Sequence, residues 1–274
     1  TDFGLTAGLH TLDPDEVSTW VGSVQAGNLY VNRGITGAIV QRQPFGGWKR
    51  SSVGPGAKAG GPNYLARLGT WHRRPLRRTG DETTLSAPVR ELIRAAAPHL
   101  AEDELRNLVG AACSDQFAWD REFGVAKDVS GLGVERNVFR YLPASVEIRH
   151  DDAPLVDLLR VVAAGRRSGA RMTVSTPAAL TLALLGVEHV VESRERWLAR
   201  MAEQRPGRIR LVGSSIEELV AAITGDPDVS IYADEVTWSG RVELLPFLLE
   251  QAVSVTNHRF GNHDPAFDSL RLTP

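Results

Sequence analysis

The sequence is poor in cysteine, because Cys113 is the only one among its 274 residues. A single cysteine excludes a disulfide bond within the chain and is typical of a reducing compartment, so we expect a cytoplasmic protein. No motif of a nucleophilic cysteine flanks Cys113, and we interpret it as a buried structural residue.

Long apolar runs and a strong net charge are also missing. No apolar run reaches the roughly 18 residues that cross a bilayer, so we expect no membrane span. The net charge of −2 gives no broad attraction to nucleic acid. We interpret the basic run at 72–80 as a solvated connector. With 42% hydrophobic and 23% charged residues, the composition is that of a soluble globular protein.

Signatures of metal and nucleotide sites are scarce. His258, His263 and Asp264 have loose ligand spacing, but no second cluster supports them, so we expect no metal site. The C-terminal half contains no Gly-x-Gly-x-x-Gly, and 212–215 is its one candidate for a phosphate-facing turn. Because short Gly-Ser turns mostly cap helices, we expect residues 137–274 not to bind NAD.

Glycine, by contrast, is abundant at 43–62, which contains six glycines in its last 17 positions. Ordered glycines bring bare backbone N–H groups close to small ligands. Lys49, Arg50 and Lys58 lie in or beside this segment, and amides together with cations suit a carboxylate or a phosphate. The alternative is a surface turn region without a ligand.

The periodicity of apolar residues predicts an α/β fold. A helix at 13–26 with Asp13 as its N-cap, followed by a strand at 29–31, precedes the glycine segment. Residues 87–112 have a helical pattern that Pro98 interrupts. From about residue 137 strands alternate with helices, which predicts a Rossmann-like parallel sheet covered on both faces.

The expected elements of that sheet define the organisation of the chain. The expected strands are 144–149, 171–175, 187–191, 208–212, 229–233 and 252–258. The expected helices are 153–168, 177–185, 193–204, 215–224 and 241–250. We therefore expect three regions, which are a first segment at 1–72, a basic connector with helices at 73–136, and the Rossmann-like region at 137–274.

Several motifs at the start of the chain form a specific combination. They are FGLTAGLH at 3–10, GNLYVNR at 27–33, QPFGG at 43–47 and GPGAKAGGP at 54–62. With them, residues 1–68 resemble the final part of an aldehyde dehydrogenase, and more narrowly of L-glutamate γ-semialdehyde dehydrogenase, also called pyrroline-5-carboxylate dehydrogenase. The resemblance implies the C-terminal end of a catalytic domain of that superfamily, which uses NAD.

That resemblance also implies roles for individual residues. The backbone amides of Gly56 and Ala57 would bind the α-carboxylate of the semialdehyde, and Tyr64 would pack on its aliphatic part. Phe45 would lie near the nicotinamide end of the cofactor site, with an ordinary core aromatic as the alternative. Family members often have a serine where this chain has Val53, which removes one hydroxyl contact.

No catalytic residue is carried over, because the family's nucleophilic cysteine and its carboxylate base lie upstream of the matched segment. Asn32 would satisfy backbone groups near the active site. The segment 1–68 would then lack the catalytic core that it packs against, so we expect exposed apolar side chains such as Trp20 and Val24.

The remaining residues carry a second resemblance. The runs DVSGLGVERN at 128–137, EQAVSVT at 250–256 and HRFG at 258–261 are similar to the extra C-terminal domain of the longer proline utilization A proteins. In those bifunctional proteins a flavin-dependent proline dehydrogenase precedes the aldehyde dehydrogenase, so FAD is implied only if such a domain precedes this chain. The extra domain is Rossmann-like and has no known catalysis.

Three interpretations of function remain open. In the first, the chain is a fragment of an NAD-dependent dehydrogenase that makes glutamate in proline catabolism, inactive alone, with the rest of a homo-oligomeric parent as its partner. In the second, it is a non-catalytic module that caps or stabilises a partner dehydrogenase. The third, a nucleotide-sensing regulator, is disfavoured by the missing phosphate motif.

Overall fold

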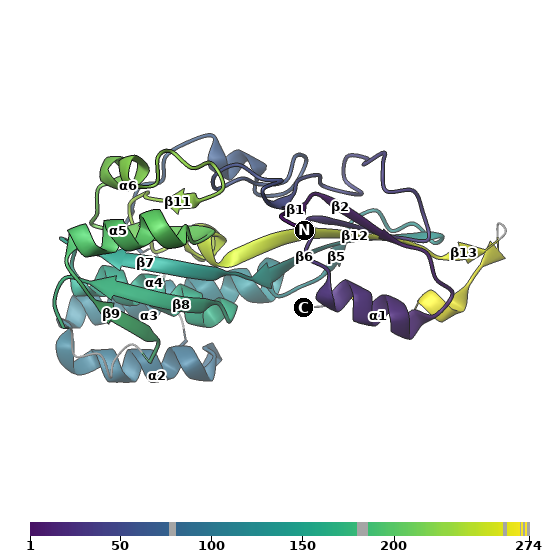
Figure 1. Cartoon of the computed structure of the whole chain (residues 1–274). Helices are drawn as coiled ribbons and strands as arrows, with labels where there is room; N and C mark the ends of the chain where they lie inside the picture. Colours follow the sequence, from purple (N-terminus) through teal and green to yellow (C-terminus); the bar gives the residue numbers. More distant parts are fainter. Residues whose placement is uncertain (77–80, 180–185, 260–261, 269, 271, 273–274) are drawn as a thin grey trace. The chain divides into compact units, whose positions relative to one another are not determined.

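The computed structural model describes residues 1–76, 81–179, 186–259, 262–268, 270 and 272. The chain forms two compact units, each built from separate parts of the sequence (Figure 1). The first unit comprises 1–68, 121–142 and 249–274, and the second comprises 69–120 and 143–248. These compact units do not coincide with the three expected regions, whose division of the chain stays a prediction.

The first unit is built on a five-stranded sheet with the order β2-β3-β12-β6-β5. These strands are β2 (Thr6–Leu9), β3 (Asn28–Val31), β12 (Leu248–Thr256), β6 (Glu135–Pro143) and β5 (Lys127–Asp128). The three strands β2, β3 and β12 are parallel, and β5 is antiparallel to β6. A strand from the end of the chain therefore lies beside one from its beginning.

The other elements of the first unit are short except for one helix, α1 (Pro14–Ser23). Asp13 is its N-cap and accepts the Asp15 N–H at 2.9 Å, which confirms the predicted cap. The remaining elements are β1 (Phe3–Gly4), β4 (Trp48–Lys49), η1 (Tyr64–Arg67), β13 (His258–Arg259), β14 (Asn262–His263) and η7 (Pro265–Phe267).

The second unit contains a parallel sheet with the order β11-β10-β7-β8-β9. Its strands are β7 (Ser145–His150), β8 (Arg171–Thr176), β9 (Glu188–Val191), β10 (Arg208–Val212) and β11 (Ser230–Tyr232). Numbered along the chain, this order reads 5-4-1-2-3, which is a doubly wound arrangement. The α/β fold with a Rossmann-like sheet is thus confirmed.

Helices cover both faces of that sheet (Figure 1). They are α2 (Ala87–Ala96), α3 (Glu102–Ala118), α4 (Leu155–Ser168), α5 (Arg194–Gln204), α6 (Ile216–Ala222) and α7 (Gly240–Glu243). Short helical turns are η2 (Glu82–Thr84), η3 (Ala97–His99), η4 (Trp119–Phe123) and η6 (Leu245–Phe247). Trp197 and Met201 of α5 pack on Ile209 and Leu211 of β10, which forms one core of this unit.

Most predicted elements of the second unit are confirmed within one or two residues. The break at Pro98 is confirmed, because α2 ends at Ala96 and α3 begins at Glu102. The predicted helix at 177–185 lies largely outside the described residues. None of the helices in the described ranges is long and apolar enough to span a membrane.

Two predictions are wrong. The helix predicted at 241–250 is a short α7 followed by η6, and β12 starts at Leu248. Pro246 cannot continue a helix here, and Leu248–Thr256 instead pairs with β3, so tertiary pairing overrides the local pattern. Trp20 and Val24 are partly buried, because they pack against the core of the first unit.

Candidate functional site

The sheet of the first unit has one mainly apolar face, which also holds the buried Arg140–Gln251 pair, and one mainly polar face. Because side chains alternate along a strand, Leu29 and Val31 of β3 and Val253 and Val255 of β12 share a face and pack with α1. The opposite face carries polar side chains. They are Asn28 and Tyr30 of β3, Asn137 and Tyr141 of β6, and Glu250 and Ser254 of β12. The glycine-rich segment binds to this polar face.

Asn28 holds the QPFGG motif against the sheet. Its side chain is 1% exposed, and its Nδ2 donates to the Pro44 carbonyl at 3.1 Å. Its Oδ1 accepts the Gly46 N–H at 3.2 Å and Lys58 Nζ at 2.8 Å. One amide side chain thus fixes two parts of the glycine-rich segment.

Lys58 is buried, with 3% of its surface exposed. Its Nζ donates to Asn28 Oδ1 and to the Gly46 carbonyl oxygen. Burial lowers the pKa of Lys58 to about 7, and the charge of Glu250 opposes that shift. Gly27 makes room for this contact, because a Cβ there would overlap the Gly46 oxygen and lie 2.8 Å from Lys58 Nζ.

Glu250 of β12 binds two points of the segment that follows. Its Oε2 accepts the Lys58 N–H at 2.8 Å, and its Oε1 accepts Asn63 Nδ2 at 2.6 Å. Asn63 Nδ2 also donates to the Tyr141 hydroxyl at 2.8 Å, and Trp48 Nε1 donates to the Glu250 carbonyl at 2.8 Å. The Glu250 carboxylate therefore holds residues 58–63 against the sheet.

A second buried network holds the start of the segment. Gln43 Nε2 donates to Asn137 Oδ1 at 2.5 Å, and the Ser254 hydroxyl donates to the same oxygen at 2.8 Å. Arg33 donates to Ser254 Oγ at 2.8 Å and forms an ion pair with Glu135 at 2.9 Å. Strands β6 and β12 thus contribute to both networks.

The structure pairs Phe45 with Ala59, two residues after the predicted carboxylate-binding residue Ala57. The backbones of Phe45 and Ala59 form a mutual pair of hydrogen bonds, at 3.0 and 2.8 Å. The Phe45 side chain is 38% exposed and Tyr64, the first residue of η1, is 47% exposed. Both rings are therefore accessible. Their contacts with a substrate and a cofactor stay predictions.

The two predicted amide donors, Gly56 and Ala57, differ in whether their N–H groups already have a hydrogen-bond acceptor. The Gly56 N–H donates to the Gly54 carbonyl at 2.7 Å, so this amide is already engaged. Within the described ranges no residue accepts the Ala57 N–H. Ala57 immediately precedes Lys58, whose own amide Glu250 binds. The structure therefore leaves Ala57 as the open donor at this position.

The sequence suggested three cations near an anion, and the structure corrects this for Lys58. Its ammonium points into the protein toward Asn28 and Gly46 and is not presented to a ligand. Lys49 Nζ donates to the Thr1 carbonyl at 3.0 Å. The Asn32 prediction is confirmed in its backbone role, because Asn32 Oδ1 accepts the Thr11 N–H at 2.9 Å.

Sequence reasoning missed Asn28, Asn63 and Glu250 as supports of the segment. Asn28 and Glu250 belong to the motifs that carry the resemblance, but no spacing rule links residues 222 positions apart. The alternation along β12 would place Glu250 opposite Val253 and Val255, but the local pattern assigns residue 250 to a helix.

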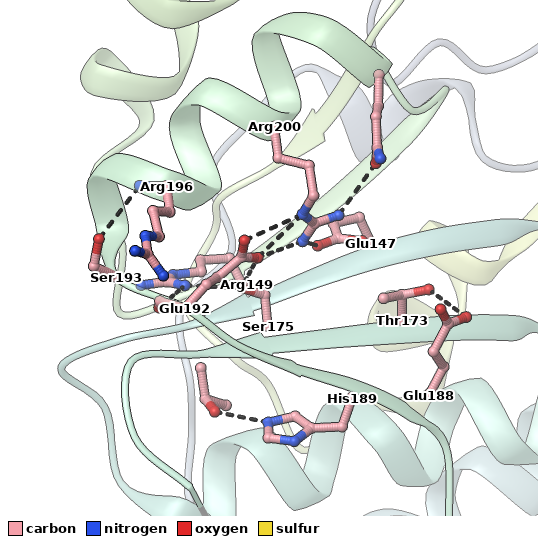
Figure 2. A network of polar contacts seen from close by, with 12 residues as sticks. Glu147, Arg149, Thr173, Ser175, Glu188, His189, Glu192, Ser193, Arg196 and Arg200 are labelled. Atoms are coloured by element: carbon pink, nitrogen blue, oxygen red, sulfur yellow. Dashed lines mark hydrogen bonds and ion pairs between the residues drawn. The ribbon is translucent and has the colours of Figure 1, made fainter.

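In the second unit, a network of ion pairs lies at and near the carboxyl ends of the parallel strands, where such folds bind nucleotides (Figure 2). Arg149 is fully buried and pairs with Asp151 at 2.5 Å. Arg200 bonds both Glu147 and Glu192 at 2.5 Å. Hydrogen bonds from Arg200 and Ser175 outweigh burial and hold the pKa of Glu192 below its usual value.

The predicted phosphate-facing turn is already bonded. The Ser214 hydroxyl donates to Asp151 Oδ2 at 2.6 Å, and Ser215 is the N-cap of α6. Gly213 has a φ of 75°, and a Cβ there would lie 2.8 Å from the Asp152 backbone. These contacts support the interpretation of this turn as a helix cap.

Cys113 and the histidines add no reactive cluster among the described residues. Cys113 lies on α3 and is partly buried, and burial with the nearby carboxylates raises the pKa of its thiol. His263 Nε2 lies 2.9 Å from Asp268. Over the ranges that the structure describes, no three His, Cys, Asp or Glu side chains converge as metal ligands.

Comparisons with known proteins identify the class of the first segment. Residues 1–70 match the aldehyde dehydrogenase family. Over 66 residues, 24% of the chain, it is 50% identical to a 1-pyrroline-5-carboxylate dehydrogenase of Bacillus cereus, covering 12% of that protein.

Relatives of a second group match the chain beyond residues 1–70. The chain is 39% identical over 154 residues to the bifunctional protein PutA of Salmonella typhimurium, covering 52% of the chain and 11% of that protein. It superposes on the structure of proline utilization A from Corynebacterium freiburgense with a TM-score of 0.73 and 41% identity, covering 96% of the chain and 24% of that protein. The chain thus spans from about a tenth to a quarter of these relatives.

Proposed function

We propose that the chain belongs to an NAD-dependent dehydrogenase that oxidises L-glutamate γ-semialdehyde, formed from pyrroline-5-carboxylate, to glutamate in proline catabolism. In this proposal the segment 54–58 binds the α-carboxylate of the substrate. The observation that supports it most is the open amide of Ala57, which is held beside the buried Lys58 in a segment related to 1-pyrroline-5-carboxylate dehydrogenases.

In this proposal the chain binds the substrate, and residues of the parent protein outside this chain carry out the reaction. Oxidation requires a thiolate that attacks the aldehyde carbon, a hydride acceptor, and water that releases the acid. NAD⁺, when bound, accepts the hydride. The exposed ring of Phe45 fits contact with a nicotinamide. Cys113 does not fit the nucleophile, because burial raises the pKa of its thiol and no motif of a nucleophilic cysteine flanks it.

The amide of Ala57 suits the non-reacting end of this substrate. A backbone N–H bonded to a carboxylate is a charge-assisted hydrogen bond worth about 1.5–3 kcal/mol. The exposed Tyr64 ring supplies an apolar surface for the methylene groups between the two ends. Such an anchor fixes the substrate without entering the reaction.

Two assays test this proposal with the full chain. We expect no NADH from pyrroline-5-carboxylate and NAD⁺, because the proposal places the nucleophile outside this chain. We also expect binding of L-glutamate, the product, to exceed that of 4-aminobutyrate, which lacks the α-carboxylate. NADH formation by the chain alone would refute its inactivity, and equal binding of the two ligands would refute the carboxylate anchor.

We further propose the wider setting that the resemblance implies. The parent protein would be a cytoplasmic homo-oligomer without nucleic-acid partners, and FAD would bind only where a proline dehydrogenase domain precedes this chain. The Rossmann-like unit would not bind NAD, which the ion pairs at its sheet edge support. Calorimetric titration of the full chain with NAD tests this last point.

A second candidate function is a module that caps a partner dehydrogenase. It is favoured by exposed apolar side chains along the loop-rich part of the first unit. They are Ile39, Val40, Val53, Leu65 and Leu68, which are 46%, 76%, 74%, 77% and 71% exposed. If this function is correct, adding the chain to a dehydrogenase truncated before this segment restores its activity. A failure to restore any activity would contradict it.

A further inference from the structure

The contacts of Glu250 give it a specific place beside the proposed anchor. It lies on β12, 192 residues after the Lys58 amide that it binds at 2.8 Å. Its second oxygen binds Asn63 at 2.6 Å, just before Tyr64. One carboxylate therefore contacts the residue after Ala57 and the residue before Tyr64, the two ends of the proposed carboxylate site.

We infer that Glu250 is a positioning residue that holds the Ala57 amide and the Tyr64 ring in place for the α-carboxylate of the substrate. This inference rests on the proposed function and adds a residue from the C-terminal strand to it. Glu250 would not touch the substrate. It would act through the Lys58 amide on one side and through the Asn63 side chain on the other.

The charges around Glu250 favour this arrangement. A carboxylate that accepts two hydrogen bonds holds the two donor groups at fixed positions. A flexible glycine-rich segment does not hold them there by itself. The buried Lys58 amine lies in the same cluster, bonds Asn28 and interacts electrostatically with Glu250. Where Lys58 is protonated, its charge balances that of Glu250, and a substrate carboxylate that approaches Ala57 meets less repulsion.

The remaining contacts show that the segment depends on β12 at this point. Phe45 and Ala59 pair through their backbones, and Lys58 bonds Gly46, but these bonds join the segment to itself. Asn28 and Glu250 are the side chains of β3 and β12 that bind Lys58 directly. Of the two, only Glu250 also reaches the Tyr64 side of the segment, through Asn63.

The experiment compares Glu250→Ala and Glu250→Gln in the full chain, with Glu16→Gln as control. Glu16 is an exposed carboxylate of α1 in the same unit and accepts from Thr11. Amide hydrogen exchange is measured at residues 56–58 and across β3. Affinities for L-glutamate and 4-aminobutyrate are measured for each variant by NMR titration.

We expect Glu250→Ala to speed exchange at Lys58 at least tenfold while β3 keeps its protection. We expect it to weaken L-glutamate binding about tenfold and 4-aminobutyrate binding less, because 4-aminobutyrate lacks the α-carboxylate and would contact only the Tyr64 ring. Glu250→Gln retains an oxygen that can accept the Lys58 N–H. This variant should therefore keep most of the exchange protection at Lys58 and most of the affinity for L-glutamate. Glu16→Gln should change neither.

Two results would overturn the inference. One is unchanged exchange at residues 56–58 in Glu250→Ala. The other is a general loss of protection in which β3 exchanges as fast as the loop, which would make Glu250 a structural residue only. A wild-type chain that binds both ligands equally would instead refute the proposed carboxylate anchor, and the exchange data would still show whether Glu250 orders the loop.

Discussion

Lys58 Nζ donates to Asn28 Oδ1 over 2.8 Å inside the first unit, where both side chains are at most 3% exposed. An ammonium in this position has lost most of its hydration and is partly compensated by Glu250. The predictions that follow begin with this group.

Stability of the first unit should depend on pH through Lys58. Its pKa is about 7 in the folded chain, against an ordinary lysine value of 10.5, so the unfolded chain binds more protons between these values. Stability should therefore rise with pH across this window, by at most about 1.4 kcal/mol per pH unit from this group. Below pH 7 both states are protonated and the contribution becomes constant.

Chemical denaturation from pH 7 to 10 tests this prediction against Lys58→Met, which removes the titrating group and keeps an apolar stem. The wild-type curve should climb relative to that of the variant as pH rises. Parallel curves for the two proteins would show that Lys58 titrates normally.

Replacing Gly27 with alanine should destabilise the first unit, because the new Cβ would overlap the Gly46 oxygen. We expect a loss of about 1–3 kcal/mol, as for other overpacking changes. Gly22→Ala is the matched control. Gly22 lies in α1 with nothing near its Cβ position, and alanine there should be neutral or stabilise by up to about 1 kcal/mol. Thermal denaturation of both variants measures the contrast, and equal losses would contradict it.

Asp115 and Arg160 form a buried bidentate pair in the second unit, with both N···O distances at 2.7 Å. Asp115→Ala should cost about 3–5 kcal/mol, because it leaves an uncompensated guanidinium in the interior. Replacing both residues, by Asp115→Leu with Arg160→Met, should recover much of this loss. Urea denaturation of the single and double variants decides the matter, and a double variant less stable than Asp115→Ala would speak against it.

Removing the Ala57 donor should weaken the proposed anchor. Ala57→Pro has no backbone N–H and should lower L-glutamate affinity about 10- to 100-fold, the loss of one charge-assisted hydrogen bond. Ala57→Ser keeps the amide and should bind as the wild type does. Titrations of the two variants with L-glutamate provide the test. Identical affinities would mean that this amide does not contact the ligand.

Local patterns predict those elements whose cause is local. The acidic cap at Asp13 and the apolar spacing of Val17 and Val21 are sufficient for α1. The parallel strands of the second unit likewise follow from short apolar runs between helices. The local pattern assigns part of β12 to a helix, because the conformation of this strand depends on pairing with β3 more than 220 residues earlier.

The candidate site likewise has features that the sequence predicts and features that it does not predict. Motifs place Gly56, Ala57 and Tyr64 in one segment, since the sequence carries their order directly. The inward direction of Lys58 could not be predicted, because it depends on Asn28 and Glu250 arriving at the same place through the sheet. A buried lysine and an exposed lysine have the same sequence signature when the burying residues are distant.

The parallel pairing of β12 with β3 also sets an order of events during synthesis. Until residues 248–256 leave the ribosome, β3 is an unpaired sheet edge and the glycine-rich segment has no Glu250 to bind. Contacts of such long sequence separation form slowly. The segment proposed to bind the substrate is therefore translated before β12 and completed only after it, and a chain that stops short of β12 would carry the motif without a formed loop.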